Sequence, residues 1–136
     1  MELREFEMDD YEAVVALWGK AGLIPSRSDA RVEIAKKLVR DPDLFLVGLE
    51  AGVIVGTVMG GYDGRRAWVY RLAVTPELQA NGFGVVLLQE LESRLRAKGC
   101  LKVNLLIETD NAGVQAFYRR RGYERDDLIF MEKWLD

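Results

Sequence analysis

The sequence predicts a single domain of mixed α/β (α+β) type, in which one central sheet carries helices on both faces. Three observations lead to this fold class. The chain has 136 residues, which suits one hydrophobic core. Segments with strand and helix patterns follow in the order β, α, α, β, β, β, α, β, α, β. A long helix separates the fourth and fifth strands, as parallel neighbours require, whereas the second, third and fourth strands adjoin through short turns.

The N-terminal part is predicted to hold a short strand and two helices. The strand covers 3–6, and the acidic pair at 9–10 supplies a cap for the first helix, which Gly22 ends. A loop over 25–29 precedes the second helix; its last residue, an aspartate, is the cap, and the proline within 41–43 ends the helix. Apolar residues recur at helical spacing in both: Ala13, Val14, Leu17 and Trp18, then Val32, Ala35, Leu38 and Val39.

The middle of the chain is predicted to form three consecutive strands. The first two cover 44–50 and 53–60, and the pair at 51–52 (Ala-Gly) forms the tight turn between them. A looser glycine-rich turn over 60–64 leads to the next strand, which covers 67–74. These strands form the antiparallel part of the expected sheet.

The C-terminal half is predicted to alternate helices and strands. A helix over 84–98 precedes a fifth strand over 101–107. Asn111 then caps a helix that Gly122 ends, and the alternation over 128–135 predicts a final edge strand. The helix over 84–98 should turn four leucines inward and carry two ion pairs outward: Leu87, Leu88, Leu91 and Leu95, with Glu90–Arg94 and Glu92–Arg96.

Composition excludes several classes of function. Hydrophobic residues make up 49% of the chain and charged residues 30%, as in ordinary globular proteins. The net charge of −3 offers no field for nucleic acid or an anionic membrane, and the charged N-terminus is unlike a signal peptide. A lone cysteine, Cys100, suits a reducing compartment, so we expect a cytoplasmic protein. With no histidine, neither a conventional zinc site nor a Ser-His-Asp triad is available, and we expect no metal.

The most informative motif is Gln79-x-x-Gly82-x-Gly84, which lies between a predicted strand and a predicted helix. The first turn of a helix presents unpaired N–H groups, and glycine lets a phosphate approach them. A Walker A run does not occur, and Leu87 occupies the position where a dinucleotide fingerprint needs glycine. A glycine-rich turn without a ligand remains the alternative for this motif alone.

A second motif makes the first more specific. It places Asn111 after the fifth strand and Phe117-Tyr118 on the following helix, which closes on Gly122-Tyr123. In this order the two motifs resemble motifs A and B of the GNAT family of N-acetyltransferases, and the closest resemblance is to its YpeA-type subgroup. The resemblance spans nearly the whole chain. It implies the acyl-CoA N-acyltransferase fold, with a mostly antiparallel sheet of six to seven strands.

The resemblance implies where acetyl-CoA binds. The loop from 79 to 85 would hold the pyrophosphate through its amides, and the strand residues just before it would hold the pantetheine arm. Asn111 and Tyr118 would add contacts, although capping alone explains Asn111 equally well. The expected cofactor-binding residues are Leu72, Ala73, Val74, Gln79, Ala80, Asn81, Gly82, Phe83, Gly84, Val85, Asn111 and Tyr118.

The resemblance also implies catalytic roles. Tyr118 lies at the position of the general acid, where a phenol that is protonated at neutral pH donates to the departing thiolate. Two positions that carry a glutamate base in relatives hold Trp68 and Leu106 here. Glu108 is the nearest carboxylate, and it is expected to lie on the same strand face as Leu106. It is either the base or simply a surface charge at the end of the strand. Water is another route for the amine proton, and Tyr62, Asp63 and Tyr70 lie in segments that can face the acceptor.

The sequence therefore predicts an acetyltransferase that moves acetyl directly from acetyl-CoA to the amine of a small molecule or peptide. A CoA-binding module with weak or no catalysis is the first alternative, because both base positions are apolar. A ribosomal-protein alanine N-acetyltransferase is the second, and Leu106 disfavours it. The acceptor-binding site should be shaped by the first two helices and the turn over 60–64. A homodimer is left open.

Overall fold

A computed structural model describes residues 1–23 and 29–135. Most of the loop predicted over 25–29 lies outside the described residues. The chain divides into two compact units, Met1–Leu105 and Leu106–Asp136.

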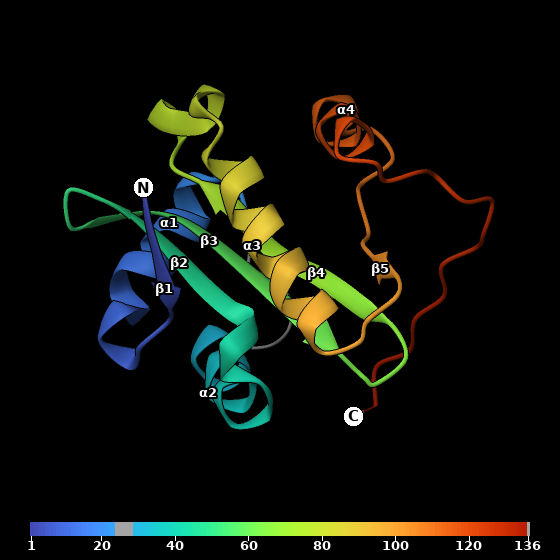
Figure 1. The fold of residues 1–136 in the computed structure, drawn as a ribbon, viewed down its shortest axis with the longest axis horizontal. Helices are drawn as coiled ribbons and strands as arrows, with labels where there is room; N and C mark the ends of the chain where they lie inside the picture. The colour runs from blue at the N-terminus through green and yellow to red at the C-terminus, as the bar shows by residue number, and fades with distance from the viewer. Residues whose placement is uncertain (24–28, 136) are drawn as a thin grey trace. The chain divides into compact units, whose positions relative to one another are not determined.

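The first unit is built on a five-stranded sheet in the order β1-β2-β3-β4-β5 (Figure 1). The strands are β1 (Glu2–Glu5), β2 (Phe45–Glu50), β3 (Val53–Tyr62), β4 (Ala67–Val74) and β5 (Val103–Asn104). The first four strands pair antiparallel, and β4 pairs parallel with β5. The predicted mixed, mostly antiparallel sheet is confirmed.

The expected number of six to seven strands is wrong for the described residues. The predicted strand over 101–107 is reduced to β5, because only Ala67 and Trp68 of β4 pair with it. The predicted edge strand over 128–135 is absent, and that segment is irregular. A strand exists through its ladder of hydrogen bonds, so an alternating pattern without a paired neighbour does not produce one.

Helices cover both faces of the sheet. They are α1 (Tyr11–Lys20), α2 (Ala30–Arg40) and α3 (Phe83–Ala97). Two residues of β3 at odd spacing show the division: Thr57 hydrogen-bonds to Trp18 of α1, whereas the Cα of Gly60 faces Leu91 of α3. Short 3₁₀ helices join these elements: η1 (Met8–Asp10), η2 (Pro42–Leu44) and η3 (Pro76–Asn81).

The face toward α1 and α2 is filled by stacked aromatic rings. The rings of Phe6 and Phe45 lie 4.3 Å apart at 5°, and the ring of Trp18 lies 6.2 Å from that of Phe45. On the other face α3 lies very close to β3. A Cβ added at Gly60 would come within 2.6 Å of a methyl group of Leu91, so glycine is needed for this approach. The four leucines predicted to turn inward on α3 are all buried.

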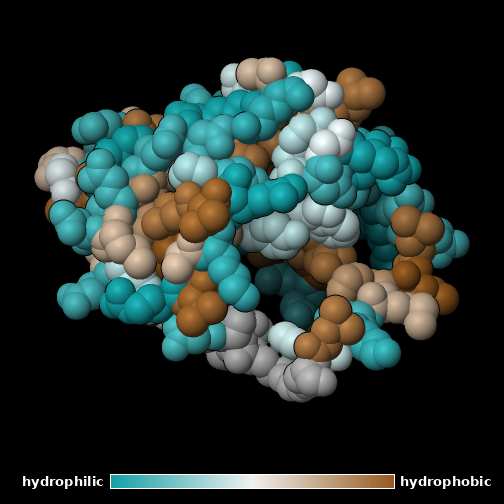
Figure 2. Space-filling view, turned by 90° about the horizontal axis from the view of Figure 1, so that it is seen from below, coloured by the Kyte–Doolittle hydropathy of each residue, from teal (hydrophilic) through white to brown (hydrophobic). Residues whose placement is uncertain are grey.

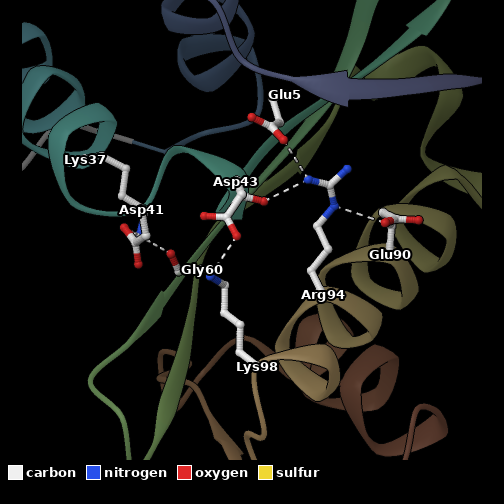
Figure 3. Close-up of polar contacts among 8 residues, drawn as sticks. All are labelled: Glu5, Lys37, Asp41, Asp43, Gly60, Glu90, Arg94 and Lys98. Carbon is white, nitrogen blue, oxygen red and sulfur yellow. Dashed lines mark hydrogen bonds and ion pairs between the residues drawn. The ribbon is translucent and has the colours of Figure 1, made fainter.

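Ion pairs anchor α3 to the N-terminal part of the unit (Figure 3). Arg94 contacts three groups: its guanidinium lies 3.0 Å from carboxylate oxygens of Glu90 and Glu5, and donates to the backbone carbonyl of Asp43 at 3.0 Å. Lys98 lies 2.8 Å from the Asp43 carboxylate. The predicted Glu90–Arg94 pair is thus confirmed as part of a larger cluster that fixes the position of α3.

Two of the predicted helix caps meet different outcomes. The side chain of Asp29 accepts hydrogen bonds from the N–H groups of Arg31 and Val32, so this cap is confirmed. Asp10 occupies the N-cap of α1, but its side chain accepts from Arg4 at 2.7 and 2.9 Å and from the N–H of Glu7 at 2.9 Å. The hydrogen bonds from Arg4 lower the pKa of the Asp10 carboxyl.

The second unit contains α4 (Ala112–Arg120) and an irregular tail. Asn111 caps α4 as predicted, since its side-chain oxygen accepts from the N–H of Val114 at 3.2 Å. The ring of Tyr118 makes edge contacts with Phe117 at 5.1 Å and with Tyr123 at 5.4 Å. These three rings therefore pack against one another within this unit.

Polar residues dominate one face of the molecule. In the face that Figure 2 shows, hydrophilic residues cover most of the area and hydrophobic residues form separate patches. None of the helices in the described part of the chain combines the length and the hydropathy that a membrane crossing requires.

Candidate active site

The N-terminus of α3 forms the predicted anion cradle. Gly82 has φ +79°, a left-handed conformation that separates η3 from α3. The first hydrogen bond of α3 runs from the N–H of Val86 to the carbonyl of Gly82 at 3.2 Å. The N–H groups of Phe83, Gly84 and Val85 precede it and have no acceptor within the helix. A Cβ at Gly82 would meet no described atom within 4 Å, so this approach is open.

The other predicted loop residues lie on η3, before the anion-binding N–H groups of α3. The side-chain amide of Gln79 donates to the carbonyl of Val74 at 3.2 Å, which ties η3 to the end of β4. Ala80 and Asn81 are exposed on η3. The structure therefore brings the end of β4 and the start of α3 together, as the motif predicted. This geometry fits a diphosphate at the helix N-terminus followed by an extended arm along β4.

Strand β4 contains a bulge that the sequence reasoning missed. Thr57 pairs with Ala73 and Met59 pairs with Tyr70, so Arg71 and Leu72 together lie opposite a single residue of β3. Arg71 has φ +53°, which is uncommon for a residue with a side chain. A glycine or asparagine would have signalled this conformation, and an arginine gives no such signal.

A buried hydrogen-bond chain fixes the bulge. The indole N–H of Trp18 donates to the hydroxyl of Thr57 at 3.0 Å, and that hydroxyl donates to the carbonyl of Arg71 at 2.9 Å. Thr57 is fully buried and Trp18 is 2% exposed. The guanidinium of Arg71 lies 4.6 Å from the Trp18 ring and donates to Glu33 of α2 at 2.9 Å. Helices α1 and α2 together thus hold Arg71 in its unusual conformation.

The β4 residues after the bulge have a free edge on the side of β5. The ladder with β5 stops after Trp68, so it does not reach Leu72, Ala73 or Val74 in the described part of the chain. Backbone groups on this edge can therefore bind an extended ligand or polarise a carbonyl. These are the strand residues that were expected to hold the pantetheine arm.

An open pocket of about 530 Å³ lies between α2 and the β3–β4 hairpin. The three residues in segments expected to face an acceptor, Tyr62, Asp63 and Tyr70, line it, and so does Trp68, which occupies one of the two familiar base positions. Glu33 also lines it and binds Arg71, so the pocket borders the bulge. Its size is within the usual range for small-molecule sites. Residues of the turn over 60–64 form one wall of this pocket and α2 forms the opposite wall. That this region receives the acceptor stays a prediction.

Tyr118 lies in the second unit with its side chain well buried. It is 8% exposed, and burial raises the pKa of its hydroxyl to about 12. The phenol is therefore protonated at neutral pH, which is the state that a general acid needs. Its hydroxyl chemistry is compatible with the predicted role.

The structural argument for Glu108 as a base is wrong in one respect. Glu108 was expected on the same strand face as Leu106, but β5 ends at Asn104 and neither residue belongs to a strand. Both are exposed, and the backbone carbonyl of Glu108 accepts from the N–H of Asn111 at 3.0 Å in the turn before α4. A shared strand face therefore gives no reason to link the two.

Comparison with known proteins shows which family this chain belongs to. Residues 2–123 match the model of the acetyltransferase (GNAT) family. An acetyltransferase of Yersinia pestis (strain Pestoides F) is 43% identical over 135 residues, covering 99% of this chain and 96% of the relative. An acetyltransferase of Pectobacterium atrosepticum is 44% identical with the same coverage. These names do not distinguish the YpeA-type subgroup, which stays a prediction.

A solved structure shows the same fold. The PaiA N-acetyltransferase of Thermoplasma acidophilum, determined in complex with coenzyme A, has a TM-score of 0.81 at 21% identity. The match covers 94% of this chain and 92% of that one. The mixed sheet, the helix that follows β4 and the relatives named above lead to one conclusion. The chain belongs to the acetyltransferase (GNAT) family of N-acetyltransferases, whose cosubstrate is acetyl-CoA.

Proposed function

We propose that this protein transfers the acetyl group of acetyl-CoA directly to the amine of a small molecule or peptide. The observation that carries the proposal is the continuity of three features: the β4 bulge, the free edge at Leu72–Val74 and the open N-terminus of α3. Bound acetyl-CoA supplies the activated acetyl group. The backbone N–H groups at 83–85 bind its diphosphate, and those on the free edge of β4 polarise the thioester carbonyl.

Proton transfer falls to side chains and water. Tyr118 donates the proton to the leaving thiolate, a role supported by the family resemblance and by a phenol that is protonated at neutral pH. Of the three pocket carboxylates, Glu33 is paired with Arg71, Asp41 lies 2.7 Å from Lys37, and Asp63 accepts from two backbone N–H groups of its own turn. None of them is free to act as a strong base, so water carries the amine proton away. An acceptor amine of low pKa is favoured, because more of it is neutral at pH 7.

The domain organisation is part of this proposal. The family model spans both compact units, since residues 2–123 include α4. We propose that residues 1–136 act as one acetyltransferase domain. Removal of residues 106–136 should then abolish acetyl transfer.

A CoA-binding module without transfer is the competing function. The observation that favours it is that Trp68 and Leu106 occupy both familiar base positions. A ribosomal-protein alanine N-acetyltransferase is less well supported, because Leu106 is an exposed apolar residue where that activity places a glutamate.

Release of free CoA thiol from acetyl-CoA, measured against a panel of amines, tests the proposal. Acceptor-dependent release that Tyr118→Phe reduces supports an acetyltransferase. Tight acetyl-CoA binding with no release above hydrolysis for any amine would support the binding module instead. Absence of acetyl-CoA binding would contradict both.

A further inference from the structure

We propose that the acceptor of this enzyme carries an anionic group, such as a carboxylate, in addition to its amine, and that Lys36 and Arg40 of α2 bind that group. The inference rests on the proposed transfer reaction and specifies its substrate class. It follows from which charges of the α2 pocket are already neutralised and which are not.

The carboxylates of the pocket are occupied by the protein itself. Glu33 accepts from Arg71 at 2.9 Å, and Lys37 lies 2.7 Å from Asp41 while also contacting the carbonyl of Gly60 (Figure 3). Asp63 accepts from two backbone N–H groups of its own turn, at 2.7 and 2.8 Å, and these hydrogen bonds lower its pKa. The pocket therefore has little free negative charge with which to attract a polycation.

Two cations of the pocket remain available. Lys36 and Arg40 line it, are exposed, and have no hydrogen-bond or ion-pair partner among the residues that the structure describes. They are four residues apart on α2, so they lie one above the other on the same helix face. An ammonium group and a guanidinium group side by side form a binding site for a carboxylate or phosphate.

Neighbouring aromatic side chains fit the same ligand. Tyr70 is 46% exposed in the pocket, and partial burial together with the charge of Asp41 raises the pKa of its hydroxyl. The phenol stays protonated at neutral pH and can donate to an anion. The hydroxyl of Tyr62 is already used, since it donates to the carbonyl of Gly64 at 3.1 Å. Trp68 adds apolar surface to the same pocket.

The position of the pocket gives the ligand its direction. Glu33 belongs both to the pocket and to the ion pair that holds Arg71 at the bulge. An anionic group at Lys36 and Arg40 leaves the opposite end of the ligand, which bears the amine, directed toward Arg71 and the free edge of β4. A primary amine separated from a carboxylate by several bonds matches this arrangement.

Two isosteric amines test the inference: para-(aminomethyl)benzoate and its neutral amide, para-(aminomethyl)benzamide. A linear diamine tests whether the pocket accepts a polycationic substrate. Turnover is followed as CoA release, and binding without acetyl-CoA is followed by calorimetry. We expect kcat/KM for the benzoate to exceed that for the benzamide by about tenfold, with the diamine poorest. Lys36→Gln and Arg40→Gln should each weaken benzoate use about three- to fivefold and leave the benzamide unchanged.

Arg96→Gln is the matched control, because Arg96 is an exposed cation on α3, over the other face of the sheet. It should change neither compound. Equal or better use of the benzamide or the diamine would overturn the inference, as would benzoate binding that both pocket variants leave unchanged. Failure of the benzoate to bind at any concentration would also overturn it. Benzoate binding that depends on Lys36 and Arg40, without CoA release for any amine, would instead refute the proposed transfer, and with it the role of the ligand as an acceptor, while supporting the anion-binding site at these two residues.

Discussion

The replacement Thr57→Val tests the buried chain that holds the β4 bulge. Valine has nearly the same shape as threonine, so the substitution removes the hydroxyl without opening a cavity. That hydroxyl accepts from Trp18 at 3.0 Å and donates to Arg71 at 2.9 Å, in a position with no exposed surface. Two buried polar groups would lose their partners, each at a cost of about 1–3 kcal/mol.

We therefore expect Thr57→Val to lower the free energy of unfolding by about 2–4 kcal/mol, partly offset by the greater hydrophobicity of valine. Urea unfolding followed by circular dichroism measures this value. Because the hydroxyl also holds the carbonyl of Arg71, kcat should fall under conditions where the variant remains folded. Thr57→Ser is the control: it retains both hydrogen bonds and loses one methyl group, at a cost of about 1 kcal/mol. A valine variant within about 0.5 kcal/mol of wild type, with unchanged kcat, would refute the role of the chain.

Substitutions at four further residues test the site and the fold. Tyr118→Phe should lower kcat by about 10²–10⁴ with acetyl-CoA affinity retained, and full activity would end the assignment. Burial raises the pKa of Tyr118 to about 12, so the stability contributed by its neutral hydroxyl is complete below the ordinary pKa of about 10 and is lost as pH rises toward 12. The free energy of unfolding, measured across that pH range, should therefore fall in the wild type by an amount that the phenylalanine variant does not show. Gly84→Val should weaken acetyl-CoA binding at least about tenfold by calorimetry, whereas Gly113→Val, at the same position in α4, should not; equal effects would contradict the cradle. Glu108→Gln should cost less than about tenfold in kcat/KM, and a loss of about a hundredfold with a vanished acidic limb would show that Glu108 is the base. Asp10→Asn should destabilise the protein at neutral pH and less in acid. The stability that comes from the lowered carboxyl pKa is present above about pH 4, the ordinary pKa, and disappears as pH falls through the lowered pKa of the folded protein. A destabilisation that does not depend on pH would contradict this.

Local chemistry allowed much of the fold to be predicted from the sequence. The turn between β2 and β3 forms at Ala51 and Gly52, which adopt φ +51° and +80° as a tight hairpin requires. Asp29 and Asn111 cap the helices that their positions indicated. The leucine stripe of α3 faces the sheet because its spacing leaves no other face apolar. The glycine motif likewise indicated where α3 begins and which backbone groups it exposes.

Interactions between distant residues decided what the sequence did not show. The bulge at Arg71 depends on contacts with Trp18, Thr57 and Glu33, which are remote in sequence, and arginine itself has no preference for that conformation. The predicted strand over 128–135 has the right alternation but no ladder in the described structure. The free charge of the pocket was equally unreadable, because a list of lysines and aspartates does not say which of them pair. Sequence by itself determined the helices, the β2–β3 hairpin and the anion-binding helix end, since these depend on neighbours along the chain. Only the tertiary structure decided the bulge and the charge left at Lys36 and Arg40, since both depend on pairing across the fold.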